Sequence, residues 1–67
     1  MDEFESYLEA VQALAGRALR ERVNELGKAY NKEDVSVIVA LNVQAERQSA
    51  RFRAITEILA KYREINS

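Results

Sequence analysis

Few residues in this 67-residue sequence are of the types that catalyse reactions or bind metal ions. The sequence contains no cysteine and no histidine, which excludes thiolate metal sites and histidine-based acid–base catalysis. The serines and the threonine consequently have no histidine to activate them as nucleophiles. We therefore predict no catalytic residue, no metal ligand and no cofactor, and we expect a protein that is not an enzyme.

Arginine is the one residue type whose spacing suggests a binding chemistry, which is contact with phosphate groups. Arg47 and Arg51 are one helical turn apart, and Arg53 follows closely. Glutamates such as Glu46 and Glu57 interleave with these arginines, and the net charge is -1. Helix faces of mixed sign are typical of solvated surfaces. RNA or DNA binding by a dimeric four-helix bundle, through Arg47, Arg51 and Arg53, is therefore the alternative hypothesis.

Apolar residues recur in the second half of the chain at alternating steps of three and four. In a helix, this spacing places all of them along one side, as in a coiled coil. We call these positions the C-terminal seam, and they predict a helix from about 32 to 66, with Ile58 and Ile65 widening its apolar face. The C-terminal seam consists of Ile38, Leu41, Ala45, Gln48, Phe52, Ile55, Leu59 and Tyr62.

Two features of this half allow a second interpretation. The segment 34–43 is rich in β-branched residues, which favours a strand, but its seam residues continue in phase with Phe52 and Ile55, which favours a helix. Gln48 is the one polar residue in the C-terminal seam. It either fixes the register of an interface, as polar seam residues do in coiled coils, or lies at the edge of the hairpin with its amide in water.

The first half of the chain has a similar apolar spacing, which we call the N-terminal seam. It predicts a helix from about 3 to 27, with Gly27 ending that helix in a left-handed conformation. A turn at about 28–31 follows, and Asn31 is a suitable N-cap for the second helix. The N-terminal seam consists of Phe4, Leu8, Val11, Ala15, Leu19, Val23, Leu26 and Tyr30.

Two helices joined by a short turn predict an antiparallel hairpin of the all-α class. We expect it to form a single domain, residues 1–67, with the longer helix at its C-terminal end. In this arrangement Ala15 and Gly16 would lie opposite Ala45, so that small residues allow the two backbones to approach closely at mid-length.

The eleven residues from Val35 to Ala45 carry no charge. Val35, Val39 and Val43 recur at every fourth position, on a side of the helix turned away from the C-terminal seam. One helix can cover only one side of another, so this side predicts association with a further helix. We expect an oligomer, either a four-helix-bundle dimer or a higher assembly. The predicted association residues are Val35, Ile38, Val39, Leu41, Val43, Phe52, Ile55, Leu59 and Tyr62.

The chain shows no signs of a membrane segment or of a cleaved export signal. Its uncharged run is too short to cross a bilayer, which needs about 20 apolar residues. The first residues are acidic where a secretory signal would be basic. We expect a protein that is cytoplasmic as synthesised and has no membrane span.

The predicted second helix resembles a known family in two places. The segment 37–42 and the segment 60–65, which contains Tyr62-Arg63-Glu64-Ile65, are similar to the C-terminal helix of the flagellar basal-body rod adaptor family, which ends in a Tyr-x-Glu-Ile signature. The needle and inner-rod subunits of type III secretion systems are likewise short helical hairpins. The resemblance covers about half of the chain, which is shorter than the rod family and lacks the proline-containing turn of needle subunits.

The resemblance implies a self-assembling structural protein from a bacterium or phage, exported without a cleaved signal. Together with the apolar spacing, it leads to one functional prediction. We predict a non-enzymatic protein that acts through helix–helix association, as a structural subunit, a small adaptor or an inhibitor. Its expected partners are further copies of itself, another helical protein, or both.

Overall fold

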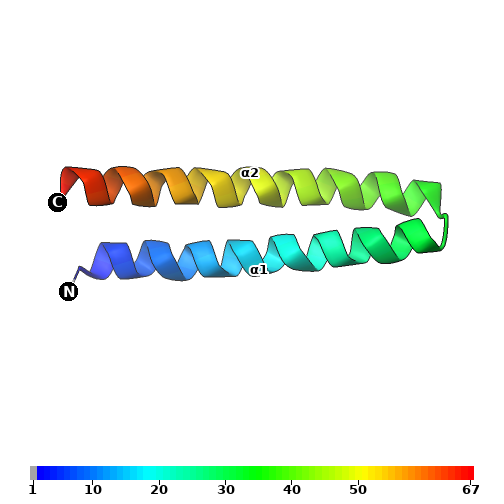
Figure 1. Ribbon diagram of the computed structural model, residues 1–67, viewed down its shortest axis with the longest axis horizontal. Helices are drawn as coiled ribbons and strands as arrows, with labels where there is room; N and C mark the ends of the chain where they lie inside the picture. Colours follow the sequence, from blue (N-terminus) through cyan, green and yellow to red (C-terminus); the bar gives the residue numbers. More distant parts are fainter. Residues whose placement is uncertain (1) are drawn as a thin grey trace.

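A computed structural model, which describes residues 2–67, consists of two long helices lying side by side and antiparallel (Figure 1). Helix α1 spans Glu3–Asn31 and helix α2 spans Val35–Ile65. The connecting turn lies at one end and both termini lie at the other. No strand occurs within residues 2–67, and 34–43 is largely helical. The predicted all-α antiparallel hairpin is therefore confirmed.

An aspartate begins each helix. The Asp2 carboxylate accepts hydrogen bonds from the backbone N–H groups of Phe4, at 2.9 Å, and Glu5, at 3.3 Å. The Asp34 carboxylate accepts one from the N–H of Val37 at 3.3 Å. Each cap satisfies N–H groups that have no partner within the helix and places negative charge at the positive end of the helix dipole.

The turn lies later in the chain than the sequence predicted. The predicted turn at 28–31 belongs to α1, and α2 starts at Val35 rather than 32. Gly27 is helical, and Glu33 is the residue with a left-handed backbone, at φ 55°. The N–H groups of Glu33 and Asp34 donate to the last carbonyls of α1, which stabilises this longer helix. The N-cap is consequently Asp34, and the predictions for Gly27 and Asn31 were wrong.

The C-terminal seam lies where it was predicted. All eight of its residues are buried or half-buried against α1, and Leu59, at 2% exposure, is the most buried residue of the core. Ile58 and Ile65, which were expected to widen the seam, are exposed. Ile58 precedes the seam residue Leu59 by one position, and Ile65 follows Ile58 by seven, so both lie beside the contact between the helices rather than within it.

The N-terminal seam was predicted less well. Phe4, Val23 and Tyr30 are exposed, whereas Arg22 is half-buried and Ala29 is buried. The predicted seam contained three successive steps of four residues up to Val23. Contact with a partner helix requires an average step of 3.5 residues, so such a run turns gradually away from the partner. Val11, Leu19 and Leu26 are half-buried as predicted, and one set of positions facing α2 recurs every seven residues, at Leu8, Ala15, Arg22 and Ala29.

Three contacts fix the register between the helices. Glu5 pairs with Arg63, Gln12 donates a hydrogen bond to Thr56, and Gly16 lies against the Phe52 ring. In each pair the two residue numbers add up to 68. In this register Ala45 lies opposite α1 at about position 23, and the predicted approach of Ala15 and Gly16 to Ala45 was wrong. The close approach at mid-length involves Phe52 instead.

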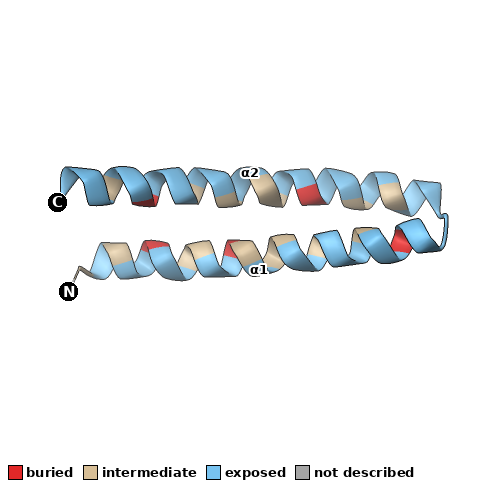
Figure 2. Cartoon of the chain, viewed as in Figure 1, coloured by how far each residue is buried: buried red, intermediate tan, exposed pale blue. Residues whose placement is uncertain are grey.

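The core of the hairpin is thin. The buried apolar residues are scattered along the contact between the helices (Figure 2), and most of the remaining surface is exposed. No large side chain within residues 2–67 is fully buried. A two-helix contact can cover only one side of each helix, so the other apolar residues remain in water. Among the residues that the structure describes, the five buried ones are Leu8, Ala15, Ala29, Ala45 and Leu59.

Candidate association surfaces

The hairpin measures 49 × 15 × 12 Å over its Cα atoms, so it has two broad faces that each expose both helices. We name them after a seam residue of α2 that borders each. The Gln48 face has at its centre a groove of about 330 Å³. The Phe52 face has one of about 660 Å³. The Gln48-face groove is lined by Val11, Leu14, Ala15, Ala18, Gln48 and Arg51.

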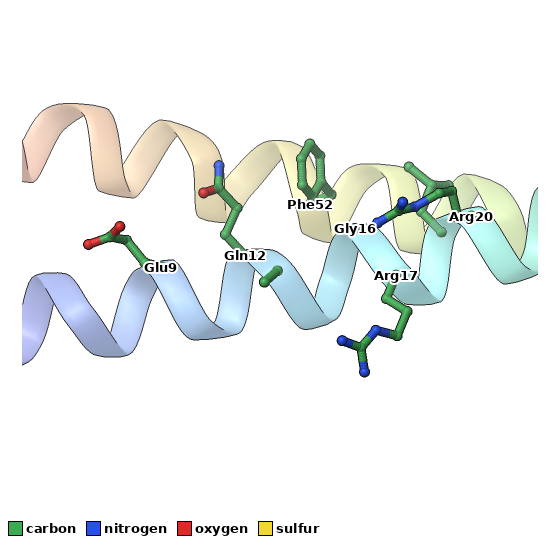
Figure 3. Close-up of a pocket in the computed structure, with 8 residues that line it drawn as sticks. Glu9, Gln12, Gly16, Arg17, Arg20 and Phe52 are labelled. Atoms are coloured by element: carbon green, nitrogen blue, oxygen red, sulfur yellow. The ribbon is translucent and has the colours of Figure 1, made fainter.

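The Phe52 face is polar around a single aromatic ring. Phe52 lies against Gly16, where an added Cβ would come within 3.2 Å of the ring. Gln12, which also lines this groove, donates a hydrogen bond of 3.0 Å to the Thr56 hydroxyl. Figure 3 shows that Arg17 points away from Phe52. The remaining lining residues are Glu9, Ala13, Arg17, Leu19 and Arg20.

The predicted association residues fall into two groups. Ile38, Leu41, Phe52, Ile55, Leu59 and Tyr62 belong to the C-terminal seam and already pack against α1. Val35, Val39 and Val43 form the second group, which we call the valine stripe. They are exposed to 70%, 59% and 42%. Among the predicted association residues, only those of the valine stripe are therefore free to contact another helix.

A neighbouring aromatic residue extends the valine stripe at the turn. Tyr30, the most exposed residue of the predicted N-terminal seam, lines a groove of about 280 Å³ together with Glu33, Val35 and Ile38. Because Ala29 takes the seam position, the Tyr30 ring lies at the surface beside the valines. The turn half of the hairpin thus exposes apolar side chains from both helices.

The sequence analysis missed a second apolar surface, on the Gln48 face. Phe4 and Tyr7 precede the groove residues Val11 and Leu14 by seven residues each, so they continue the same side of α1. On α2, Ile58 and Ile65 follow Arg51 at steps of seven. Phe4, Tyr7, Leu14, Ile58 and Ile65 are all exposed. The 4-7-11-14-18 spacing in α1 was the available signal, but it overlaps the N-terminal seam at Phe4 and Val11.

Gln48 reaches into this face. Its Oε1 atom is buried and accepts no hydrogen bond from residues 2–67. Of the two interpretations of Gln48, the one that places its amide in water at the edge of the hairpin therefore does not hold for the amide oxygen. A buried amide oxygen without a donor destabilises a fold by about 1–3 kcal/mol.

Polar contacts join the helices at the end that carries the termini. The Tyr62 hydroxyl donates a hydrogen bond to the Asp2 carboxylate, and the Tyr62 ring meets Phe4 edge-on, with centroids 4.9 Å apart. Arg63 donates to Glu5 at 2.6 Å and lies 3.6 Å from Glu9.

These contacts shift the pKa values of their members. The Tyr62 hydrogen bond lowers the pKa of Asp2, and the carboxylate in turn raises the pKa of Tyr62. The hydrogen bond to Glu5 raises the pKa of Arg63. All three groups are solvent-accessible, so their contacts orient the helix ends and contribute little to stability.

The structure does not gather the three arginines of the alternative hypothesis on one side. Arg47 and Arg51 lie about 40° apart around α2, whereas Arg53 lies about 160° from Arg51, at about 100° per residue. Arg51 lines the Gln48-face groove. Phosphate binding through all three arginines stays a prediction.

Other kinds of site find little support. Within residues 2–67, no three carboxylates are grouped so that they could hold a metal ion. None of the described helices is long and apolar enough to span a membrane. No protein-family model, curated protein or solved structure matches the chain.

Proposed function

We propose that this chain is a non-enzymatic protein that acts through helix–helix association, as a self-assembling subunit or a small adaptor. One observation carries the proposal, which is the surface that the lone hairpin exposes. A compact folded protein of 7.6 kDa exposes about 4,300 Å². The hairpin exposes 5333 Å², which is about 1,000 Å² more.

The excess surface is rich in apolar side chains. Within residues 2–67, eleven large hydrophobic residues are exposed, against five buried residues of which three are alanine. Burying apolar surface stabilises by about 25 cal/mol per Å², and a chain of this size has few other sources of stability. Association would therefore supply stability that the hairpin lacks alone.

The valine stripe is the surface that we propose for a helical partner. Val35, Val39 and Val43 lie along one side of α2, and Tyr30 borders them near the turn. An uncharged helix surface of this kind accepts the apolar side of another helix. The resemblance of 37–42 to the rod adaptor family supports a self-assembling partner, although the same residues would suit an adaptor.

Val39→Glu tests this proposal. Burying the new carboxylate against apolar neighbours costs several kcal/mol, so the interface should open. We expect a smaller oligomer, or loss of the partner, with unchanged helical content in circular dichroism. Ala10→Glu is the matched control, because Ala10 is an exposed residue of α1, on the other helix from the stripe. Wild-type mass and interactions in Val39→Glu would refute the proposed role of the stripe.

A further inference from the structure

The Gln48 face has the properties of a surface that pairs with a copy of itself. We propose that a second copy of the chain packs on this face, with the two-fold axis along the length of the hairpin, to form an antiparallel four-helix bundle. This inference rests on the proposed function and names the partner for one of the two apolar surfaces. The area, the distribution of side chains, the charges and Gln48 each support it.

The area of the face suits a stable dimer. A face of 49 × 15 Å, measured over Cα atoms, covers about 700 Å², and a standard protein interface buries about 800 Å² per partner. The surface in excess of a compact protein is of similar size, about 1,000 Å². One second copy on one broad face would therefore bring the exposed area to that of an ordinary folded protein.

The apolar side chains are unevenly distributed along this face, and this selects the symmetry axis. Phe4, Leu14 and Ile58 are exposed in the half near the termini. In the half near the turn, a separate groove is lined by four charged residues and two apolar ones, which are Glu25, Lys28, Lys32, Asp34, Ala29 and Val37. A two-fold axis across the hairpin would place the apolar half on the charged half. An axis along the hairpin places the apolar halves together and makes every neighbouring pair of helices antiparallel.

The charges agree with this axis. Rotation about the long axis leaves each residue at the same height along the hairpin. A residue of α1 in one copy therefore lies opposite the residue of α2 in the other copy for which the two numbers add up to 68. Glu21 then lies opposite Arg47 of the second copy, and Leu14 lies opposite Ala54. All four residues are exposed in the single hairpin. An acidic residue thus meets a basic one at the rim, and an apolar residue meets a small one.

Gln48 gives this pairing a polar contact at mid-length. Its buried Oε1 belongs to a residue that lines the central groove of the face, beside Arg51. In the two-fold bundle, Gln48 of each copy lies at the same height, and its amide, once turned out of the hairpin, bonds to the amide of Gln48 or the guanidinium of Arg51 of the second copy. A single polar residue within an apolar seam is known to select one register and one oligomeric state.

Cysteine cross-linking tests the arrangement, because the natural chain contains no cysteine. Leu14→Cys and Ala54→Cys are purified separately, mixed and oxidised. A disulfide requires Cα atoms within about 7 Å, which the bundle provides only between the two variants. We expect the mixed disulfide to dominate over either homodimer. Leu14→Cys mixed with Ala50→Cys is the control, since Ala50 lies on the outer side of α2, and it should yield little product.

The outcomes separate this inference from the proposed function. A Leu14–Ala54 yield no higher than the Ala50 control would overturn the Gln48-face dimer. If the wild type were still oligomeric and Val39→Glu dissociated it, association would stand and only the face would be wrong. As a second measurement, Leu14→Glu should weaken the dimer by about tenfold or more, with helical content retained. An unchanged dimer in that variant would equally overturn the inference.

Discussion

The two halves of the hairpin are held together differently. Near the termini, side chains of α1 and α2 bond across the contact, as in Asp2–Tyr62, Glu5–Arg63 and Gln12–Thr56. In the half near the turn, the side-chain hydrogen bonds of the described residues stay within one helix or within the turn. The turn holds the helices together there, since closing so short a loop costs little entropy. The open end depends on side-chain contacts.

The halves also differ in the apolar surface that they expose. The turn half carries the valine stripe and Tyr30, which lie mainly on α2 and beside the turn. The open half carries Phe4, Tyr7 and Ile58 on the Gln48 face. The hairpin therefore offers two separate apolar surfaces, which are the valine stripe with Tyr30 in the turn half and the Gln48 face, whose residues Phe4, Tyr7 and Ile58 lie in the open half. A variant can disturb one surface and leave the other as an internal control.

The largest expected effect is on stability in the open half. Leu59→Ala removes the most buried side chain, which is 2% exposed, and should lower the free energy of unfolding by about 3–4 kcal/mol. Leu41→Ala makes the same change in the turn half, where the side chain is only half-buried, and should lower it by less. Urea denaturation measures both. Equal losses would show that the two halves contribute alike.

The next effect concerns the polar residue near the boundary between the halves. Gln48→Leu removes the buried oxygen that lacks a donor. At low protein concentration, the variant should gain about 1–2 kcal/mol in the free energy of unfolding. At high concentration it should lose the single dimeric state and form mixed species. Thermal melts and sedimentation velocity check the two parts, and a destabilised monomer would contradict the first.

The two glycines provide a smaller comparison. A Cβ on Gly27, in the turn half, would meet no atom within 4 Å, so Gly27→Ala should stabilise the helix by about 1 kcal/mol. A Cβ on Gly16 would lie 3.2 Å from the Phe52 ring, so Gly16→Ala should gain less or lose stability. Melting temperatures decide. An equal gain at both sites would mean that the helices do not approach closely at Gly16.

The smallest effect is a pH dependence confined to the open end. The folded pKa of Asp2 is lowered from 3.8, so its contribution is present above that pH and is lost as the pH falls through the lowered value. The folded pKa of Tyr62 is raised from 10.0, so its contribution is present below that pH and is lost as the pH rises through the raised value.

Tyr62→Phe removes the hydrogen bond responsible for both shifts. Its stability should vary less with pH below 3.8 and above 10.0 than that of the wild type. Tyr7→Phe is the control, because Tyr7 is an exposed tyrosine of α1. Melting curves from acid to alkaline pH compare the three proteins. Identical pH profiles for the wild type and Tyr62→Phe would show that the Asp2–Tyr62 bond contributes nothing.

The fold was predictable because one helix keeps a strict period. The C-terminal seam alternates steps of three and four from Ile38 to Tyr62, and its contact with α1 follows directly. In α1 the apolar residues are more numerous than the contact can cover, so Val23 and Tyr30 were chosen where Arg22 and Ala29 face α2. Hydrophobicity alone does not distinguish a contact position from its apolar neighbour.

The turn was mispredicted and the second surface was missed for a different reason. Both depend on contacts between residues distant in the chain or on backbone geometry. Gly27 is a favourable end for a helix, but the left-handed residue is Glu33. The apolar side chains of Phe4 and Ile58 meet on one face only once the register is known. The exposure of the valine stripe, by contrast, followed from the four-residue spacing alone.

The molar mass of the purified chain over a range of concentrations tests the central claim of association most directly. Light scattering coupled to gel filtration gives this mass without labels. We predict a rise from 7.6 kDa at low concentration to twice that value or more, with Val39→Glu or Leu14→Glu each giving a lower mass than the wild type. A mass of 7.6 kDa at every concentration, for the wild type and for both variants, would contradict self-association.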